Sequence, residues 1–106
     1  MEALKFEPYL QTPEIDFNPE SGKMIIRGKS YPGDAIDFYL PLINWVKEYV
    51  KTKPPKTELN CEIESLNSAS QKQLVELFVA FKPLTEKNSL LVIWKYEEGD
   101  DDILTV

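Results

Sequence analysis

The stretch TELNCEIESLNSASQKQLVELFVAFK, residues 57–82, changes its periodicity partway along and so indicates how the chain folds. From Thr57 to Glu64, apolar residues alternate with polar ones, which is typical of a strand with one buried face. From about Ala69 to Lys82, apolar residues recur at helical spacing, and Pro83 then ends or bends this helix. A strand followed directly by an amphipathic helix is the unit from which α/β folds are built.

Two further strands are expected near the N-terminus. Residues 13–29 have the pattern of a hairpin, with alternating apolar residues on both sides of a turn at residues 18–22. Met24 and Ile26 would share the buried face of its second strand. Residues 4–10 add an edge strand or an extended arm, because prolines within and just after them limit strand pairing.

A long helix is predicted from Asp34, a plausible N-cap, to about Lys51. Pro41 falls inside it, and we expect a kink there rather than a second helix start, because the apolar residues keep their phase on both sides. The expected core face consists of residues at helical spacing with two tyrosines beside them. These residues are Ile36, Leu40, Ile43, Val46 and Val50, with Tyr39 and Tyr49.

The last predicted strand runs from Ser89 to Tyr96, and its nearly continuous apolar sequence favours a central position in the sheet. The acidic run at residues 97–102 is interpreted as a solvated turn, with a cation site as the alternative. The element order predicts an α/β fold, a mixed sheet of four to five strands with helices mainly on one face. The expected core comprises Ile43, Val46, Ile63, Leu74, Leu77, Phe78, Phe81 and Val92.

The composition opposes several classes of function. The 106 residues indicate one domain, and the net charge of −6 opposes binding to nucleic acid or anionic lipid, so proteins are the expected partners. The absence of histidine removes His-dependent catalytic triads and metal sites. Neither a secretory signal nor an apolar run long enough for a membrane span is visible, and the single cysteine, Cys61, is expected to be buried and inert. A cytoplasmic location without cofactors follows as the expectation.

The junction LNSASQ, residues 66–71, is the expected site of chemistry. A hydroxyl in the first turn of a helix faces unpaired N–H groups and the positive end of the helix dipole, so a phosphate there is stabilised. Ser68 is therefore a candidate phosphoacceptor. Ser68 and Gln71 are also spaced as a capping box, in which the two side chains only satisfy backbone N–H groups. These residues alone leave both interpretations open.

Five segments spread along the chain resemble, in order, the signature blocks of the SiaC family of bacterial regulatory phosphoproteins. The resemblance implies a fold similar to the STAS domain of anti-sigma-factor antagonists and a single domain over residues 1–106 that lacks a C-terminal helix present in relatives. The blocks are Gln11-Thr12-Pro13-Glu14-Ile15, Ser30-Tyr31-Pro32, Ile43-Asn44-Trp45-Val46-Lys47-Glu48-Tyr49, Leu66-Asn67-Ser68-Ala69-Ser70 and Trp94-Lys95-Tyr96.

The resemblance also implies a non-catalytic adaptor that is switched by a Ser/Thr kinase and a metal-dependent Ser/Thr phosphatase. In its unphosphorylated form such a protein activates a diguanylate cyclase, which raises cyclic di-GMP and controls biofilm. The family phosphoacceptor is a threonine directly after the Leu-Asn pair, and Ser68 occupies that position here. Ala69 is a second departure, since relatives often carry another hydroxyl at this point.

A partner-binding surface is expected around the phosphoacceptor. If both strand-to-helix loops leave the same end of the sheet, the loop after the third strand meets the start of the second long helix. Two alternatives remain open, an anti-sigma-factor antagonist that captures an anti-sigma kinase and a carrier of a small apolar molecule. The residues expected on this surface are Tyr31, Pro32, Asn67, Ser70, Gln71 and Lys72.

Overall fold

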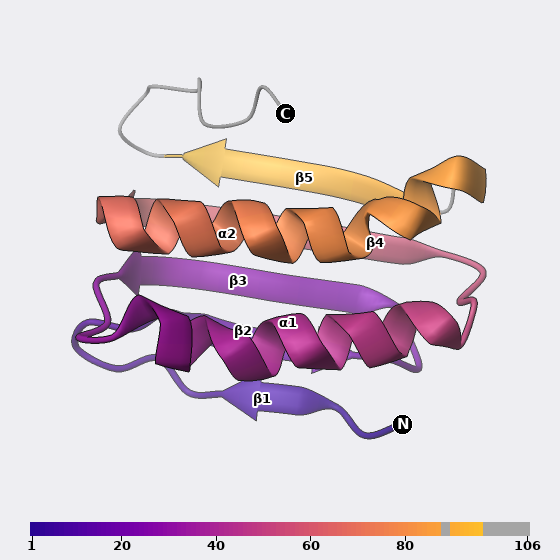
Figure 1. The fold of residues 1–106 in the computed structure, drawn as a ribbon, viewed down its shortest axis with the longest axis horizontal. Coiled ribbons are helices and arrows are strands. Elements are labelled where there is room, and N and C mark those ends of the chain that lie inside the picture. Colours follow the sequence, from indigo (N-terminus) through magenta and orange to yellow (C-terminus); the bar gives the residue numbers. More distant parts are fainter. Residues whose placement is uncertain (88–89, 97–106) are drawn as a thin grey trace.

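The computed structural model describes residues 1–87 and 90–96. A five-stranded mixed sheet has the strand order β1-β2-β3-β4-β5, and two helices cover one of its faces (Figure 1), so the predicted fold class is confirmed. The strands are β1 Leu4–Phe6, β2 Glu14–Asn18, β3 Lys23–Ser30, β4 Thr57–Leu66 and β5 Leu90–Tyr96. The helices are α1 Ala35–Lys51 and α2 Ser68–Phe81, and the short 3-10 helix η1 Lys82–Lys87 follows α2.

The direction of the strands determines where the loops meet. β1, β2 and β3 are antiparallel neighbours, whereas β3, β4 and β5 run parallel to one another. α1 connects β3 to β4 and α2 connects β4 to β5, so both are crossovers of the same hand and lie on one face (Figure 1). The loops that precede both helices therefore leave the same end of the sheet.

The turn of the predicted hairpin is confirmed and has a clear local cause. The Asn18 side chain accepts hydrogen bonds from the backbone N–H groups of Glu20 and Ser21. Gly22 has a φ of 77°, and a Cβ at this position would collide with the carbonyl oxygen of Lys56. Glycine is thus required both for its backbone conformation and for the close approach of the neighbouring chain.

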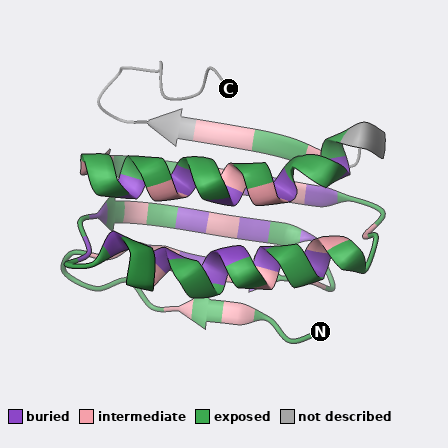
Figure 2. Ribbon diagram, viewed as in Figure 1, coloured by how far each residue is buried: buried purple, intermediate pink, exposed green. Residues whose placement is uncertain are grey.

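The hydrophobic core lies between the helices and the sheet, and Figure 2 marks the buried residues in purple on both helices and on the strands behind them. It confirms six of the eight predicted core residues, including Leu77, Phe81 and Ile63, which are buried. Phe78 is only half-buried and contacts Trp94 edge to face, with ring centroids 5.6 Å apart. Val92 was expected in the core but is exposed.

The expected core face of α1 is confirmed for Ile43, Val46, Tyr39 and Tyr49 but is wrong for Ile36 and Leu40, because the buried face is rotated toward the tyrosines. Ile36 and Leu40 are 61% and 49% exposed, whereas Tyr39, Leu42 and Tyr49 are buried. Burying a tyrosine requires a partner for its hydroxyl. Tyr39 Oη lies 2.6 Å from Ser30 Oγ, and Tyr49 Oη lies 2.7 Å from Thr57 Oγ1. These strand hydroxyls select the tyrosine side of the helix for the core.

Strand β5 is an edge strand and not the central one expected from its apolar sequence. Its residues alternate between the two sheet faces, and α2 reaches it through Phe78, while Leu91 and Val92 remain exposed. The apolar sequence of β5 therefore does not indicate a strand that is covered on both faces. The acidic segment 97–102 lies outside the described residues.

Helix α1 continues through Pro41 as one uninterrupted element, so the expectation of a single helix is confirmed. Its N-cap is Asp34, as predicted, with Oδ1 accepting from the N–H of Asp37 at 3.1 Å. Pro41 is exposed. Within residues 1–87 and 90–96, neither helix combines the length and the apolar content that crossing a membrane requires.

Candidate phosphorylation and partner-binding site

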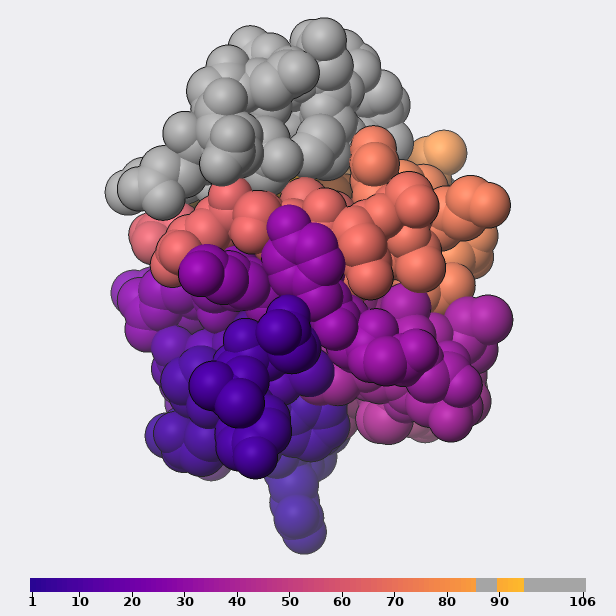
Figure 3. All heavy atoms as spheres, turned by 90° about the vertical axis from the view of Figure 1, so that its left-hand side faces the viewer, coloured from indigo at the N-terminus to yellow at the C-terminus, as the bar shows by residue number. Residues whose placement is uncertain are grey.

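The ends of β3 and β4 bring the two predicted loops together. Ser30 and Leu66 are paired in the parallel register, and Asn67 N–H donates to the carbonyl oxygen of Ser30 at 3.2 Å. Tyr31 and Ser68 directly follow this bonded pair, so the expected meeting of the two loops is confirmed. Figure 3 views the molecule from this end, with the purple start of α1 beside the red start of α2.

The first turn of α2 is capped by Asn67 and not by Ser68. Asn67 Oδ1 accepts from Ser70 N–H at 2.9 Å, and its carbonyl oxygen accepts from Gln71 N–H at 3.0 Å. The capping box of Ser68 and Gln71 is therefore wrong, because the amide side chain one residue earlier already fills that role. Ser68 is the first residue of the helix, and its hydroxyl is not the cap.

Ser68 is exposed at the position where a helix best tolerates negative charge. The N–H groups of Ser68 and Ala69 belong to the first turn and have no carbonyl partner within the helix. A phosphate on Ser68 could accept hydrogen bonds from them at the positive end of the dipole. Lys72, also exposed, lies one helical turn further on the same side and offers a counter-charge.

A network of buried hydroxyl groups joins the first turn of α2 to β3. Ser30 Oγ donates to Ser70 Oγ at 2.9 Å, and Ser70 Oγ donates to the Ser30 carbonyl oxygen at 3.0 Å. The Tyr39 hydroxyl completes the network through Ser30 Oγ. Ser68 thus lies between two anchored residues, Asn67 and Ser70, which fixes the backbone that presents its hydroxyl.

Ser70 is consequently not a contact residue. It was expected on the partner surface, but it is fully buried, because its hydroxyl is used to join α2 to β3. Pro32 is buried as well and can only shape its loop. Tyr31 is 37% exposed, and Gln71 and Lys72 are exposed, so these three side chains remain available at this end.

The structure adds a feature that the sequence interpretation missed, an exposed Tyr9-Leu10 pair in the loop between β1 and β2. Tyr31 N–H donates to the carbonyl oxygen of Gln11 at 2.7 Å, which attaches this loop to the same end of the molecule. Two large apolar residues enclosed by Pro8 and Pro13 were the available signal. They were assigned to an irregular edge segment, and nothing local to them shows which end of the sheet they reach.

Burial suppresses the acidity of two other candidate groups. It raises the pKa of Tyr39 to about 12, although the hydrogen bond with Ser30 acts in the opposite direction. Burial also raises the pKa of the Cys61 thiol well above its ordinary range, which confirms the buried position expected for this residue. In the described part of the chain no group of three or more acidic or cysteine side chains is placed to hold a metal ion.

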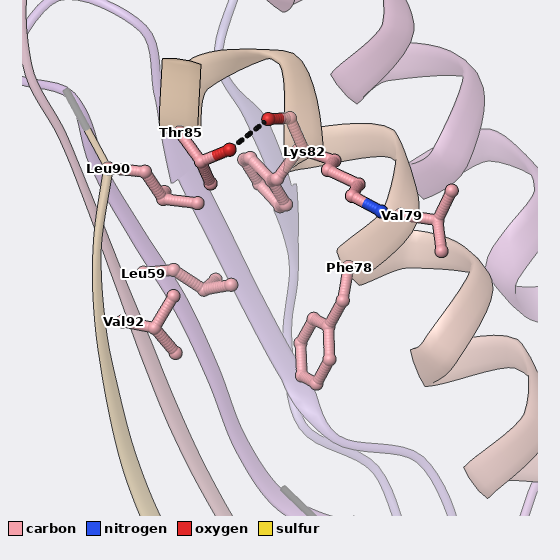
Figure 4. A pocket seen from close by; sticks show the side chains of 8 residues that line it. Leu59, Phe78, Val79, Lys82, Thr85, Leu90 and Val92 are labelled. Carbon is pink, nitrogen blue, oxygen red and sulfur yellow. Dashed lines mark hydrogen bonds between the residues drawn. The ribbon is translucent and has the colours of Figure 1, made fainter. Parts of the chain in front are cut away.

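An open apolar pocket of about 390 Å³ lies away from the phosphoacceptor, between α2 and the sheet (Figure 4). Leu59 and Val92 point toward Phe78 across it, and η1 closes one end. Thr85 Oγ1 donates to the carbonyl oxygen of Lys82 at 2.7 Å, so this hydroxyl is already used within the chain. The lining is otherwise apolar apart from Lys82, and no polar group of the Ser68 end of the molecule contributes to it.

The architecture defines a small α/β domain with both helices on one face and a hydroxyl exposed at a helix start. A family described as SiaC family regulatory phosphoprotein matches residues 6–106, and the chain belongs to this family. A curated relative is an uncharacterized protein of Pseudomonas aeruginosa (strain UCBPP-PA14), 26% identical over 66 residues. That match covers 62% of this chain and spans about half, 52%, of the relative.

Two solved structures share the fold. Crystalline apo-SiaC from Pseudomonas aeruginosa superposes with a TM-score of 0.79 at 21% identity, covering 91% of this chain and 78% of SiaC. The second is SiaC in a complex described as the diguanylate cyclase SiaD with its activator SiaC, from the same organism. Its TM-score is 0.75 at 21% identity, covering 86% of this chain and 74% of that one.

Proposed function

We propose that the chain is a non-catalytic cytoplasmic regulator whose unphosphorylated form binds and activates a diguanylate cyclase, and that phosphorylation of Ser68 switches it off. The observation that carries this proposal is the exposed hydroxyl of Ser68 as the first residue of α2, beside the Tyr31 loop. A Ser/Thr kinase and a metal-dependent phosphatase would set the phosphate level.

The family membership and a related complex support the proposed partner. The family consists of regulatory phosphoproteins, and SiaC of Pseudomonas aeruginosa is described as the activator of the diguanylate cyclase SiaD. This favours a cyclase over an anti-sigma factor as the partner. In this chain the loops that precede α1 and α2 lie at the same end of the sheet, which would let one partner contact both.

The geometry explains how a phosphate would change binding without changing the fold. Ser68 is exposed, so a phosphate adds about −1.5 to −2 charges at the surface and displaces no core side chain. A partner packed against the bare hydroxyl would instead have to desolvate a strongly hydrated anion. Such a penalty of several kcal/mol reduces affinity by about a hundredfold or more.

The test is affinity for the diguanylate cyclase of the source organism, measured by calorimetry with three proteins. Wild type and Ser68→Ala should bind alike, and Ser68→Asp should bind about a hundredfold more weakly. Mass spectrometry of protein purified from its native host should find the phosphate on Ser68. Phosphate confined to another residue, or equal affinity of all three proteins, would reject Ser68 as the switch.

A control variant distinguishes an effect of charge at Ser68 from an effect of added negative charge elsewhere on the surface. Ser21 is exposed in the β2–β3 turn, at the opposite end of β3 from Ser68. Ser21→Asp adds the same charge far from the proposed surface and should leave the affinity unchanged. Recovery of an anti-sigma factor in place of a cyclase with the Ser68→Ala protein would support the alternative partner.

A further inference from the structure

The most exposed pair of large apolar side chains in the described residues lies in the loop between β1 and β2. Tyr9 is 77% exposed and Leu10 is 78% exposed. Scattered single apolar residues are normal on a surface, but two adjacent ones at a loop tip form a small apolar projection. Tyrosine contributes large contact area at low entropic cost, which is why it is common in binding surfaces.

This loop has features that limit its motion before any partner binds. Tyr9 N–H donates to the carbonyl oxygen of Thr12 at 3.1 Å, which closes the tip. Pro8 and Pro13 flank the tip, and each fixes one backbone dihedral. A projection that is already ordered loses less conformational entropy on binding than a flexible one.

The loop also belongs to the same end of the molecule as Ser68. Gln11 is bonded to Tyr31, and Ser30, the residue before Tyr31, is bonded to Asn67. This chain of backbone hydrogen bonds runs from the loop tip to the residue before the phosphoacceptor. In Figure 3 the indigo N-terminal segment, the purple start of α1 and the red start of α2 are neighbours on one face.

We infer that Tyr9 and Leu10 are the apolar anchor of the partner surface, inserting into an apolar pocket with a basic rim on the regulated protein. The rim is assigned from charge, since Glu7 in the loop and Asp34 and Asp37 at the start of α1, the neighbouring segment in Figure 3, are all exposed. This inference rests on the proposed function and adds a site that the phosphoacceptor alone does not define.

A second copy of the chain fits this projection poorly. The apolar pocket of Figure 4 lies beside β5, whereas the loop follows β1 at the opposite edge of the sheet. Insertion of the loop of one molecule into this pocket of the next, unless reciprocated about a two-fold axis, would be a head-to-tail contact that builds a ring or an open chain. The occupant assigned to the loop is a different protein, the regulated partner.

The experiment compares Tyr9→Ser/Leu10→Ser with wild type in binding to the diguanylate cyclase of the source organism. Because both side chains are exposed, the variant should unfold at the same temperature as wild type, yet bind about thirtyfold more weakly or worse. Leu91→Ser is the matched control, since Leu91 is 49% exposed on β5 and should bind normally. Higher salt should slow association of wild type through loss of the charge attraction.

The outcomes separate the inference from the function on which it rests. Wild type that binds, Ser68→Asp that does not, and a loop variant equal to Leu91→Ser would overturn the anchor and leave the switch intact. A cyclase that binds none of the proteins would reject both. A loop variant that changes only self-association in sedimentation would also overturn the inference, by assigning the loop to contacts between copies.

Discussion

Ser30 holds the start of α2 through two of its atoms. Its carbonyl oxygen accepts from Asn67 N–H and Ser70 Oγ, and its hydroxyl joins Ser70 to Tyr39. These residues come from β3, α1 and α2, so the network links three elements at one point. Neither its existence nor its partners follow from local sequence, because Ser30 and Ser70 are 40 residues apart.

The cap at Asn67 predicts unequal effects of two neighbouring substitutions. Asn67→Ala removes the acceptor of Ser70 N–H and should lower the free energy of unfolding by about 1 kcal/mol. Ser68→Ala removes no cap and should change it by less than about 0.5 kcal/mol. Urea denaturation of both variants checks this, and a larger loss for Ser68→Ala would mean that Ser68 is the cap after all.

The raised pKa of Tyr39 predicts a loss of stability in alkaline solution. Burial raises the pKa of Tyr39 to about 12 in the folded state, whereas an ordinary tyrosine has a pKa near 10. This difference in pKa corresponds to about 2–3 kcal/mol of unfolding free energy. The stabilisation is fully present below pH 10 and is lost as the pH rises toward 12. The free energy of unfolding should therefore fall across this interval.

Tyr39→Phe is the control for this pH dependence. It should cost about 1 kcal/mol at neutral pH, through the lost hydrogen bond to Ser30, and should show a smaller fall between pH 10 and 12 than wild type. Denaturation of both proteins at a series of pH values measures the difference. Parallel curves would show that Tyr39 titrates normally.

At the scale of elements, periodicity predicted the helices and the hairpin, but not every buried face. The alternation in β2, β3 and β4 places Ile15, Met24, Ile26, Leu59 and Ile63 in the core because these strands have a helix over one side. In α1, an aliphatic stripe competed with tyrosines, and the tyrosines were buried because strand hydroxyls satisfy them. That choice depends on partners outside the helix.

Helix α2 provides a matched test of burial with two phenylalanines. Phe81 is fully buried, and its replacement by alanine should cost about 3–5 kcal/mol of unfolding free energy. Phe78 is half-buried against Trp94, so Phe78→Ala should cost distinctly less. Chemical denaturation of the two variants gives both values, and equal losses would show that Phe78 is as deeply packed as Phe81.

At the scale of the whole molecule, the element order was sufficient to predict a mixed sheet and the meeting of the two loops. The position of β5 at an edge was not predictable from its composition, because an apolar run does not reveal how many helices cover it. The Tyr9-Leu10 loop was missed for a related reason. Its place beside Tyr31 arises from antiparallel pairing of β1, β2 and β3, not from its own sequence.

The strand order predicts a gradient of protection from hydrogen exchange. β3 and β4 each have neighbours on both sides and support the core, so their amides should exchange most slowly. β1, with only three residues at one edge, should exchange fastest. Native-state exchange followed by NMR measures the order, and protection of β1 equal to that of β3 would contradict it.

The burial of Ser70, two residues from Ser68, has a consequence for how the proposed switch responds to its input. Because the Ser70 hydroxyl is buried, only Ser68 of these two residues can carry a phosphate, so each molecule is either phosphorylated there or unphosphorylated. The amount of active protein would then follow the unmodified fraction in direct proportion, without the threshold that several phosphorylation sites create.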